Sequence, residues 1–287
     1  MRRVPADVGR LFQSDAASAF GIIYDCTLAE GDGHPMLRPA TGRGDIKTMQ
    51  SILILGSGPS VTQAQLWPRV GFDHILAINN AWRVRPDWDA LIHPWDFPVD
   101  RRPLPGPNQA LITQDDFVPA QNAYGGFVYA GGTMAFTAGY YALHAHRPRV
   151  IAMFGCDMHY PKKGQTHFYG TGTPDPLRND ISLQSLEAKS ARLMVLAAMQ
   201  GCAMVNLSNG PTRLMFPRMA RTALDRASPQ IYCADLAAEA LALEAELGYV
   251  VPSGRYWEHL DQFDPSQLAR LDALWYAAAT QPLRISA

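Results

Sequence analysis

The segment from Gly155 to Gly170 gathers side chains that can move protons and contact phosphate. It holds an acid, two histidines and two tyrosines: Asp157, His159, Tyr160, His167 and Tyr169. Histidine titrates near neutral pH and serves as a general base, while a tyrosine hydroxyl can stabilise a departing phosphate without a metal ion. We predict a catalytic loop centred on His167 and Tyr169; the alternative is that its histidines are structural.

A glycine turn ends the first apolar run of the chain, with the sequence Gly56-Ser57-Gly58-Pro59-Ser60. Glycine lets a ligand approach the backbone closely, and proline suits the first position of a helix. The amides of that helix start, with the two serine hydroxyls, would receive a phosphate or a ribose. The dinucleotide fingerprint is incomplete, because its third glycine is missing. The alternative is a tight turn without a ligand.

Polar residues also follow the second and third apolar runs, where open α/β sheets bind ligands. Asn79 and Asn80 stand where an acidic residue would complete the dinucleotide fingerprint. An amide donates and accepts hydrogen bonds, which suits a nucleobase or a sugar hydroxyl; the alternative is a bond to the following turn. His93 follows the third run in the same way.

Asp87-Trp88-Asp89 has the spacing of the metal-binding DxD motif found in many sugar transferases. Here it precedes an apolar strand, whereas the metal motif follows one. We therefore expect a turn or cap role for it and predict no metal site.

Short apolar runs alternate with helical segments and predict the sheet that positions these residues. Strands are expected at 51–56, 74–79, 90–93, 110–113, 150–155 and 203–207. Helices are expected at 59–67, from about 131 to 145, at 183–200, at 234–248 and at 267–279. Strands that alternate with helices predict an α/β fold with a Rossmann-like, mainly parallel sheet flanked by helices, followed by a helical C-terminal part.

The sequence divides into three parts by pattern. Residues 1–48 show no sustained period and are expected to be a loosely ordered extension or, alternatively, a partner-binding arm. Residues 49–210 form the predicted nucleotide-binding domain, and residues 211–287 a helical segment packed on it. Leucines of this last segment predict core packing or a homo-oligomer contact: Leu236, Leu241, Leu243 and Leu247.

The composition excludes several classes of partner. With 287 residues, 47% of them hydrophobic and 18% charged, the chain has the balance of a globular protein. A net charge of -1 argues against nucleic acid and acidic membrane surfaces as partners. No apolar run approaches the length of a membrane span, and no secretory signal is evident, so a cytoplasmic location is expected. The four cysteines are too widely spaced for a zinc or redox motif.

From Ser51 to Leu207 the order of these motifs resembles the small bacterial sialyltransferases with a Rossmann-like fold. It also resembles the broader set around them, which includes archaeal pterin diphosphokinase-like proteins and phage-encoded chains. The phage-type chains look most similar, through the blocks Ile78-Asn79-Asn80-Ala81-Trp82-Arg83 and Phe154-Gly155-Cys156-Asp157-Met158 followed by Thr166-His167-Phe168.

The resemblance implies a donor site for a cytidine monophosphate-linked sugar, with no metal required. In it Gly56, Gly58, Pro59 and Ser60 would line the donor with Asn79, and Gly132 with Thr133 would take the place of a Ser-Gly helix opening. His159, Tyr160 and Tyr169 would contact phosphate, and His167 would be the base. Two positions depart from the family. His93 stands where a polar amide is usual, and His167 lies closer to the Asp157 strand than the family's base does.

Three functions follow as expectations. The first is a metal-independent glycosyltransferase that moves a sugar from a nucleotide-activated, CMP-linked donor to a hydroxyl of a glycan or small-molecule acceptor. The second is a Mg²⁺-dependent pterin or nucleotide diphosphokinase, for which Asp96 and Asp157 are the candidate carboxylate pair. The third is a non-catalytic, phage-associated nucleotide-binding protein.

Overall fold

A computed structural model describes residues 51–173 and 175–281, which belong to one compact unit. The predicted extension, residues 1–48, lies outside these described residues. Within them, six parallel strands form one sheet in the order β4-β3-β2-β1-β5-β6. The strands are β1 (Ser51–Leu55), β2 (His74–Ile78), β3 (Ala90–Ile92), β4 (Ala110–Ile112), β5 (Val150–Phe154) and β6 (Ala203–Asn206). The predicted α/β class with a parallel sheet is confirmed.

The order of the strands places a change of direction between β1 and β5. From β1 the chain adds β2, β3 and β4 on one side, then returns to place β5 and β6 on the other. At such a switch point the connections leave in opposite directions, and ligands of open α/β sheets bind beyond the carboxyl ends of the strands there. The glycine turn follows β1 and the predicted catalytic loop follows β5, so both lie at this point.

The central strand is buried on both faces, as its unbroken apolar run predicts. Ile52 and Ile54 face one core, and Leu53 and Leu55 face the other; all four side chains are 0% exposed. Alternate side chains of a strand point to opposite faces of the sheet, so a run without polar residues fits a strand covered on both sides.

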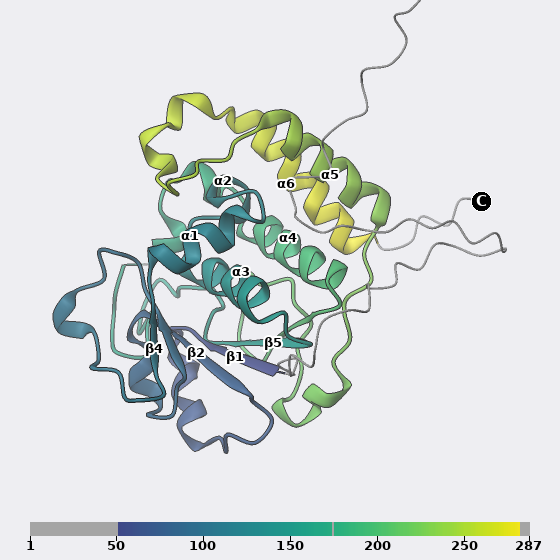
Figure 1. Cartoon of the computed structure of the whole chain (residues 1–287). Helices are drawn as coiled ribbons and strands as arrows, with labels where there is room; N and C mark the ends of the chain where they lie inside the picture. The colour runs from purple at the N-terminus through teal and green to yellow at the C-terminus, as the bar shows by residue number, and fades with distance from the viewer. Residues whose placement is uncertain (1–50, 174, 282–287) are drawn as a thin grey trace, which may run out of the picture. The chain divides into compact units, whose positions relative to one another are not determined.

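The two faces of the sheet are covered differently. One face carries α1 (Gln114–Asn122), α2 (Phe127–Ala130), α3 (Met134–His146) and α4 (Leu186–Met199), and their apolar residues join the core of Ile52 and Ile54. Figure 1 shows α5 (Ala234–Leu247) and α6 (Pro265–Thr280) stacked outside α4 as a further layer. The predicted helical C-terminal part is present.

The other face of the sheet is covered by 3₁₀ segments and loops. Its core takes Val61 and Ala64 from η2 (Pro59–Leu66) and further residues from η3 (Asn79–Val84) and η7 (Arg221–Arg226). A helix was expected over 59–67, and a 3₁₀ run to Leu66 is found instead. No side chain caps its start, two β-branched residues stand in its first turn, and Pro68 favours the extended conformation at Trp67 that ends it.

A buried ionic network joins the C-terminal helices to α4. The Arg192 guanidinium donates to both Glu244 carboxylate oxygens at 2.7 Å and to the Tyr140 hydroxyl at 2.7 Å. The Trp275 indole N–H donates to Glu244 at 2.7 Å. Lys189 pairs with Asp272 at 2.7 Å beside it. These contacts tie α4 to α5 and α6 through charges that are almost wholly buried.

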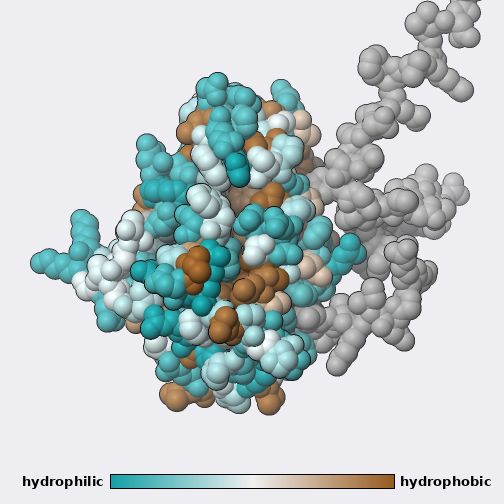
Figure 2. Space-filling model, turned by 60° about the vertical axis from the view of Figure 1, so that its left-hand side comes forward, coloured by the Kyte–Doolittle hydropathy of each residue, from teal (hydrophilic) through white to brown (hydrophobic). Residues whose placement is uncertain are grey.

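Several large apolar side chains are exposed on the connection between β3 and β4. Trp95, Val99 and Leu104 are 67%, 75% and 97% exposed. Figure 2, which turns the β4 side of Figure 1 forward, shows apolar patches set among polar residues. Isolated exposed apolar side chains are ordinary on a protein surface and identify no site by themselves.

Candidate functional site

The glycine turn after β1 packs directly against the end of β5. The Gly56 amide donates to the Phe154 carbonyl at 2.8 Å, and the Gly58 amide donates to the Gly155 carbonyl at 2.8 Å. A Cβ atom on Gly56 would lie 2.3 Å from the Gly155 oxygen, and one on Gly58 would lie 2.9 Å from it. The two glycines are therefore required by the contact between the turns, and their amides are already used.

The predicted catalytic loop is fastened to this turn. The Phe168 amide donates to the Ser57 carbonyl at 3.0 Å, and the Phe168 ring packs on the core of Leu53 and Leu55. His167 and Gly170 form a tight antiparallel bridge, with N–H to carbonyl distances of 3.0 and 3.1 Å. The structure thus brings the His167 loop and the glycine turn together, although they lie far apart in the sequence.

Thr166 fixes the orientation of the His167 ring. The buried Thr166 hydroxyl lies 2.9 Å from His167 Nδ1, donates to the Gly172 carbonyl at 3.2 Å and accepts from the Gly172 amide at 2.8 Å. We assign the single hydroxyl proton to the Gly172 carbonyl, and Thr166 then accepts a hydrogen bond from His167 Nδ1. In this assigned tautomer Nδ1 carries the ring proton and Nε2 has the free lone pair.

Two tyrosines flank the His167 imidazole. The Tyr169 ring is stacked on it, with centroids 5.1 Å apart and planes 24° from parallel, and the Tyr160 ring centroid lies at 5.8 Å. Burial lowers the pKa of His167, which keeps the ring neutral, and burial raises the pKa of Tyr160, which keeps that hydroxyl protonated. His159 is exposed and makes no ring contact with this cluster in the described part of the chain.

Asn79 and Asn80 follow β2, the strand beside β1. Asn79 has a φ of 51°, in the left-handed region that asparagine tolerates better than most residues. The side-chain oxygens of Asn79 and Asn80 are buried without a hydrogen-bond partner among the described residues. A buried acceptor without a donor costs free energy, so two of them at the ligand edge of a sheet need an explanation.

His93 has a local partner instead. Its ring is 2% exposed, Nδ1 lies 2.9 Å from the Pro94 carbonyl, and the ring packs on Phe97 with centroids 5.5 Å apart. This geometry is that of a buried turn residue.

Asp157 holds the segment that follows β6. Its carboxylate accepts from the Asn206 amide at 3.0 Å, and its carbonyl accepts from the Arg213 amide at 2.9 Å. The Ser208 hydroxyl in turn accepts from the Gly155 amide at 3.3 Å. Neither Asn206 nor Ser208 is among the predicted site residues, although Asn206 ends β6 and Ser208 follows the predicted strand as the selected residues do.

Gly132 and Thr133 precede α3, with Thr133 at the N-cap position. The Gly132 amide donates to the Ser182 hydroxyl at 2.9 Å, and a Cβ atom on Gly132 would lie 2.3 Å from the Tyr256 hydroxyl. Tyr256 donates to Asp180 at 2.7 Å and thereby joins the C-terminal segment to the carboxyl edge. No sequence signal connects Tyr256 with this edge, because the contact spans 76 residues.

The carboxylates of the DxD-like sequence serve the opposite edge of the sheet. Asp87 forms a bidentate pair with Arg85 at 2.6 and 2.7 Å, and Asp89 accepts from the Ile75 amide at 2.7 Å. Both precede β3, which agrees with the expected turn role. Across residues 51–173 and 175–281, no three His, Cys, Asp or Glu side chains are placed to hold a metal ion.

Comparisons with protein-family models, with curated proteins and with solved structures find no significant match for this chain. The resemblance to the sialyltransferases stays an expectation, and the interpretation of the site rests on its geometry. In the described residues, no helix is both long enough and apolar enough to cross a membrane.

Proposed function

We propose that this protein is a metal-independent glycosyltransferase that uses a nucleotide-activated, CMP-linked sugar and a hydroxyl acceptor, with His167 as the general base. The observation that carries the proposal is the fixed His167 imidazole, held by Thr166 in a loop bound to the glycine turn. General bases in enzymes are commonly a neutral histidine whose second nitrogen is hydrogen-bonded to a fixed acceptor.

The reaction we propose moves one proton and exchanges one bond. The acceptor hydroxyl gives its proton to His167 Nε2 as its oxygen attacks the anomeric carbon of the donor. The bond from that carbon to the phosphate oxygen breaks, and the configuration at carbon is inverted because attack and departure are in line. The lowered pKa of His167 supports this role, because at neutral pH the ring is unprotonated and can accept the proton.

Tyr160 and Tyr169 are the proposed donors to the departing phosphate. Both rings contact His167, so their hydroxyls belong to the same cluster as the base. The raised pKa of Tyr160 keeps its hydroxyl protonated, which is the form that donates a hydrogen bond to an anion. His159, which is exposed beside Tyr160, is the remaining proposed phosphate contact.

The donor site we propose differs from a glycine-rich loop that binds phosphate through its backbone amides, because those amides already have partners here. The amides of Gly56 and Gly58 are bound to the end of β5 and to Gly155, so the proposed polar groups for a nucleotide are the side chains of Ser57, Ser60, Asn79 and Asn80. The two asparagine oxygens are buried in this structure, so a nucleotide would reach them only after a local side-chain movement. An unpartnered amide oxygen accepts a hydrogen bond from a base amino group or a ribose hydroxyl, which would remove the cost of leaving it unpaired.

The diphosphokinase alternative has less support. Its candidate carboxylates, Asp96 and Asp157, follow β3 and β5, and β2 and β1 lie between those strands. Three strand spacings separate the two chain positions by roughly 14 Å. Asp157 is also engaged by Asn206. The non-catalytic nucleotide-binding alternative shares the donor site and differs only in turnover.

A thermal-shift screen against CMP, CDP, UDP, GDP, ATP and NAD, each with and without Mg²⁺, tests the proposal. We expect CMP to stabilise the protein without Mg²⁺, and a CMP-linked sugar then to release CMP when an acceptor is added. Stabilisation by ATP only with Mg²⁺ would favour the diphosphokinase. CMP binding without CMP release would favour the non-catalytic protein. Gly58→Val is unsuitable as a binding variant, since a side chain there collides with Gly155.

A further inference from the structure

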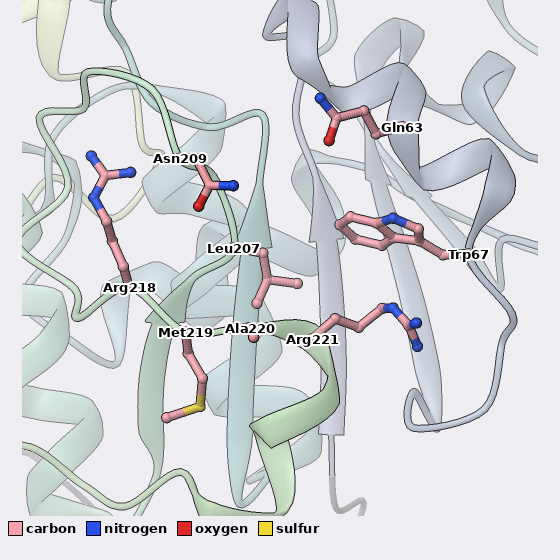
Figure 3. A pocket seen from close by; sticks show the side chains of 8 residues that line it. All are labelled: Gln63, Trp67, Leu207, Asn209, Arg218, Met219, Ala220 and Arg221. Carbon is pink, nitrogen blue, oxygen red and sulfur yellow. The ribbon is translucent and has the colours of Figure 1, made fainter.

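A surface hollow of about 330 Å³ opens on the face of the sheet covered by the 3₁₀ segments. We call it the Trp67 hollow; it is lined by Gln63 and Trp67 from the region of η2, and by residues of the 207–221 segment that follows β6. Figure 3 shows the Trp67 ring on one wall and Leu207 with Ala220 opposite it. The volume is at the lower end of the range that binds small organic ligands.

The hollow has the charge of an anion site. Two arginines, Arg218 and Arg221, line it, and no carboxylate does. The Arg218 guanidinium is occupied by the Ser208 and Gly210 carbonyls, and in Figure 3 it is turned away from Trp67. Arg218 thus holds the turn that carries Asn209.

Arg221 is the cation left available. Its guanidinium carbon lies 6.0 Å from the Trp67 ring centroid, at the outer limit of a cation–π contact. Among the described residues, the Arg221 guanidinium has no other side-chain contact of this kind, neither an ion pair nor a hydrogen bond. An arginine that is neither paired with a carboxylate nor closely stacked can form a bidentate contact with a carboxylate or phosphate at little cost.

Trp67 supplies a rigid aromatic surface for the remainder of a ligand. Phe154 packs against its ring with centroids 4.5 Å apart and planes 32° from parallel, which fixes the indole in place. Because the Arg221 guanidinium lies over the ring at 6.0 Å, a ligand ring takes this position as Arg221 turns from the indole to the anionic group. Figure 3 shows the Gln63 and Asn209 amides at the same rim of the hollow, where they can hydrogen-bond the edge of a flat polar ring. An aromatic wall, one free cation and two amides together select a small planar anion.

We propose that the Trp67 hollow binds an aromatic ring that carries a carboxylate or phosphate, with the ring on Trp67 and the anionic group on Arg221. Two kinds of molecule share this chemistry: an aromatic carboxylate and a nucleoside monophosphate. The proposal is independent of the glycosyltransferase function, because none of the residues that line the hollow belongs to the His167 cluster.

The test is a titration followed through the tryptophan indole N–H signals in two-dimensional NMR spectra of the full chain. The probes are indole-3-acetate, CMP, AMP and inorganic phosphate. We expect one of the aromatic anions to shift the Trp67 signal, which Trp67→Leu identifies, and to leave the buried Trp275 signal unchanged. Inorganic phosphate alone should bind at least about tenfold more weakly, since it lacks the stacking contribution. Binding of indole-3-acetate would indicate an aromatic carboxylate as the ligand, and binding of CMP or AMP would indicate a nucleoside monophosphate.

Matched arginine variants complete the test. Arg221→Gln should weaken binding of the aromatic anion about tenfold or more, through loss of a charge-assisted hydrogen bond. Arg226→Gln, an exposed arginine at the other end of the same 3₁₀ segment, should not change it. The proposal is wrong if no probe shifts Trp67, or if Arg221→Gln binds as the unchanged protein does. It is also wrong if His167→Ala abolishes the Trp67 shift, because the hollow would then be part of the His167 site.

Discussion

Two groups of buried polar side chains, one between α4, α5 and α6 and one at the carboxyl edge of the sheet, differ in how completely they are hydrogen-bonded. The Arg192 network between α4, α5 and α6 partners both oxygens of Glu244 and all three guanidinium nitrogens. At the carboxyl edge of the sheet, by contrast, the amide oxygens of Asn79 and Asn80 are buried without partners. His167 there is fixed at one nitrogen only.

We interpret the difference as one between groups that support the fold and groups that a ligand would partner. A buried charge is tolerated only when its hydrogen bonds are complete. A complete network therefore needs no ligand, because holding α4, α5 and α6 in their relative positions is a sufficient role for it. An incomplete one has a cost that a ligand can recover. In the described residues, however, the buried Gln121 amide also has no hydrogen-bond partner and the Asp272 carboxylate has only its ion pair with Lys189, so incomplete bonding alone does not identify a ligand site.

Glu244→Gln should be the most destabilising of the changes we consider. It leaves the Arg192 charge buried without a counter-ion, and removing one partner of a buried pair costs about 3–5 kcal/mol of unfolding free energy. The measurement is urea unfolding followed by circular dichroism. Arg270→Gln is the matched control, because its pair with Glu239 is exposed and should contribute less than about 1 kcal/mol. A loss below about 1 kcal/mol in Glu244→Gln would contradict a supporting role for the network.

His167→Ala should have the opposite signature, with little loss of stability and a large loss of turnover. Removing a general base lowers kcat by about 10²-fold or more, while CMP should still stabilise the protein. Thr166→Val should lower kcat by a smaller factor and alter its pH profile, because Nδ1 loses its acceptor. Thr171→Val, an exposed threonine of the same loop, is the control. Equal losses of CMP binding and turnover in His167→Ala would argue against the base role.

Asn79 offers a smaller and more discriminating test. Asn79→Gly keeps the left-handed backbone and removes the amide, whereas Asn79→Ala removes the amide and strains the backbone by about 1–2 kcal/mol. We expect both variants to lose the stabilisation by CMP, and only the alanine variant to lose intrinsic stability. Thermal unfolding with and without CMP measures both quantities. Retention of the CMP effect in Asn79→Gly would show that the unpartnered amide is not part of the donor site.

The sequence predicts the parts of this fold that depend on short-range pattern. Continuous apolar runs locate the strands, and glycine at the end of β1 marks a close approach. The apolar pattern does not predict α1, because Pro119 interrupts it. The capping box formed by Thr113 and Asp116 was a usable signal for this helix. The 3₁₀ form of η2 was missed too, because apolar spacing does not separate it from an α-helix over eight residues.

The site is less predictable than the fold, because its contacts join distant segments. The His167 loop could be placed near the glycine turn only by assuming that it follows the adjacent strand. Two contacts depend on packing alone. The amides of the glycine turn hydrogen-bond to the end of β5, and the Tyr256 hydroxyl lies against Gly132. The Trp67 hollow joins Gln63 to Arg221, a separation that no local motif signals.

The amino edge of the sheet, opposite the predicted ligand edge, holds a further buried atom without a hydrogen-bond partner. His74 Nε2 has no partner in the described residues, and the His74 ring lies 4.7 Å from that of His146. Burial lowers the pKa of both rings, and for His146 burial together with the charge of a protonated His74 lowers it to about 4. Asp89, 3.8 Å from His74 Nδ1, opposes the shift at His74, and Arg69 adds to it.

This pair should make the fold sensitive to mild acid. Both histidines are neutral in the folded state, while in the unfolded chain they bind protons below their ordinary pKa of 6.5. The contribution of these two rings to the free energy of unfolding should be constant only above about pH 7.5 and should fall by about 1 kcal/mol toward pH 5, since the rings are only partly buried and solvent screens the effect. His167, whose pKa is also lowered by burial, adds to the fall. Urea unfolding at each pH measures it. His146→Gln should flatten the curve and the exposed His144→Gln should not; a curve unchanged by His146→Gln would mean that the unpartnered His74 nitrogen needs another explanation.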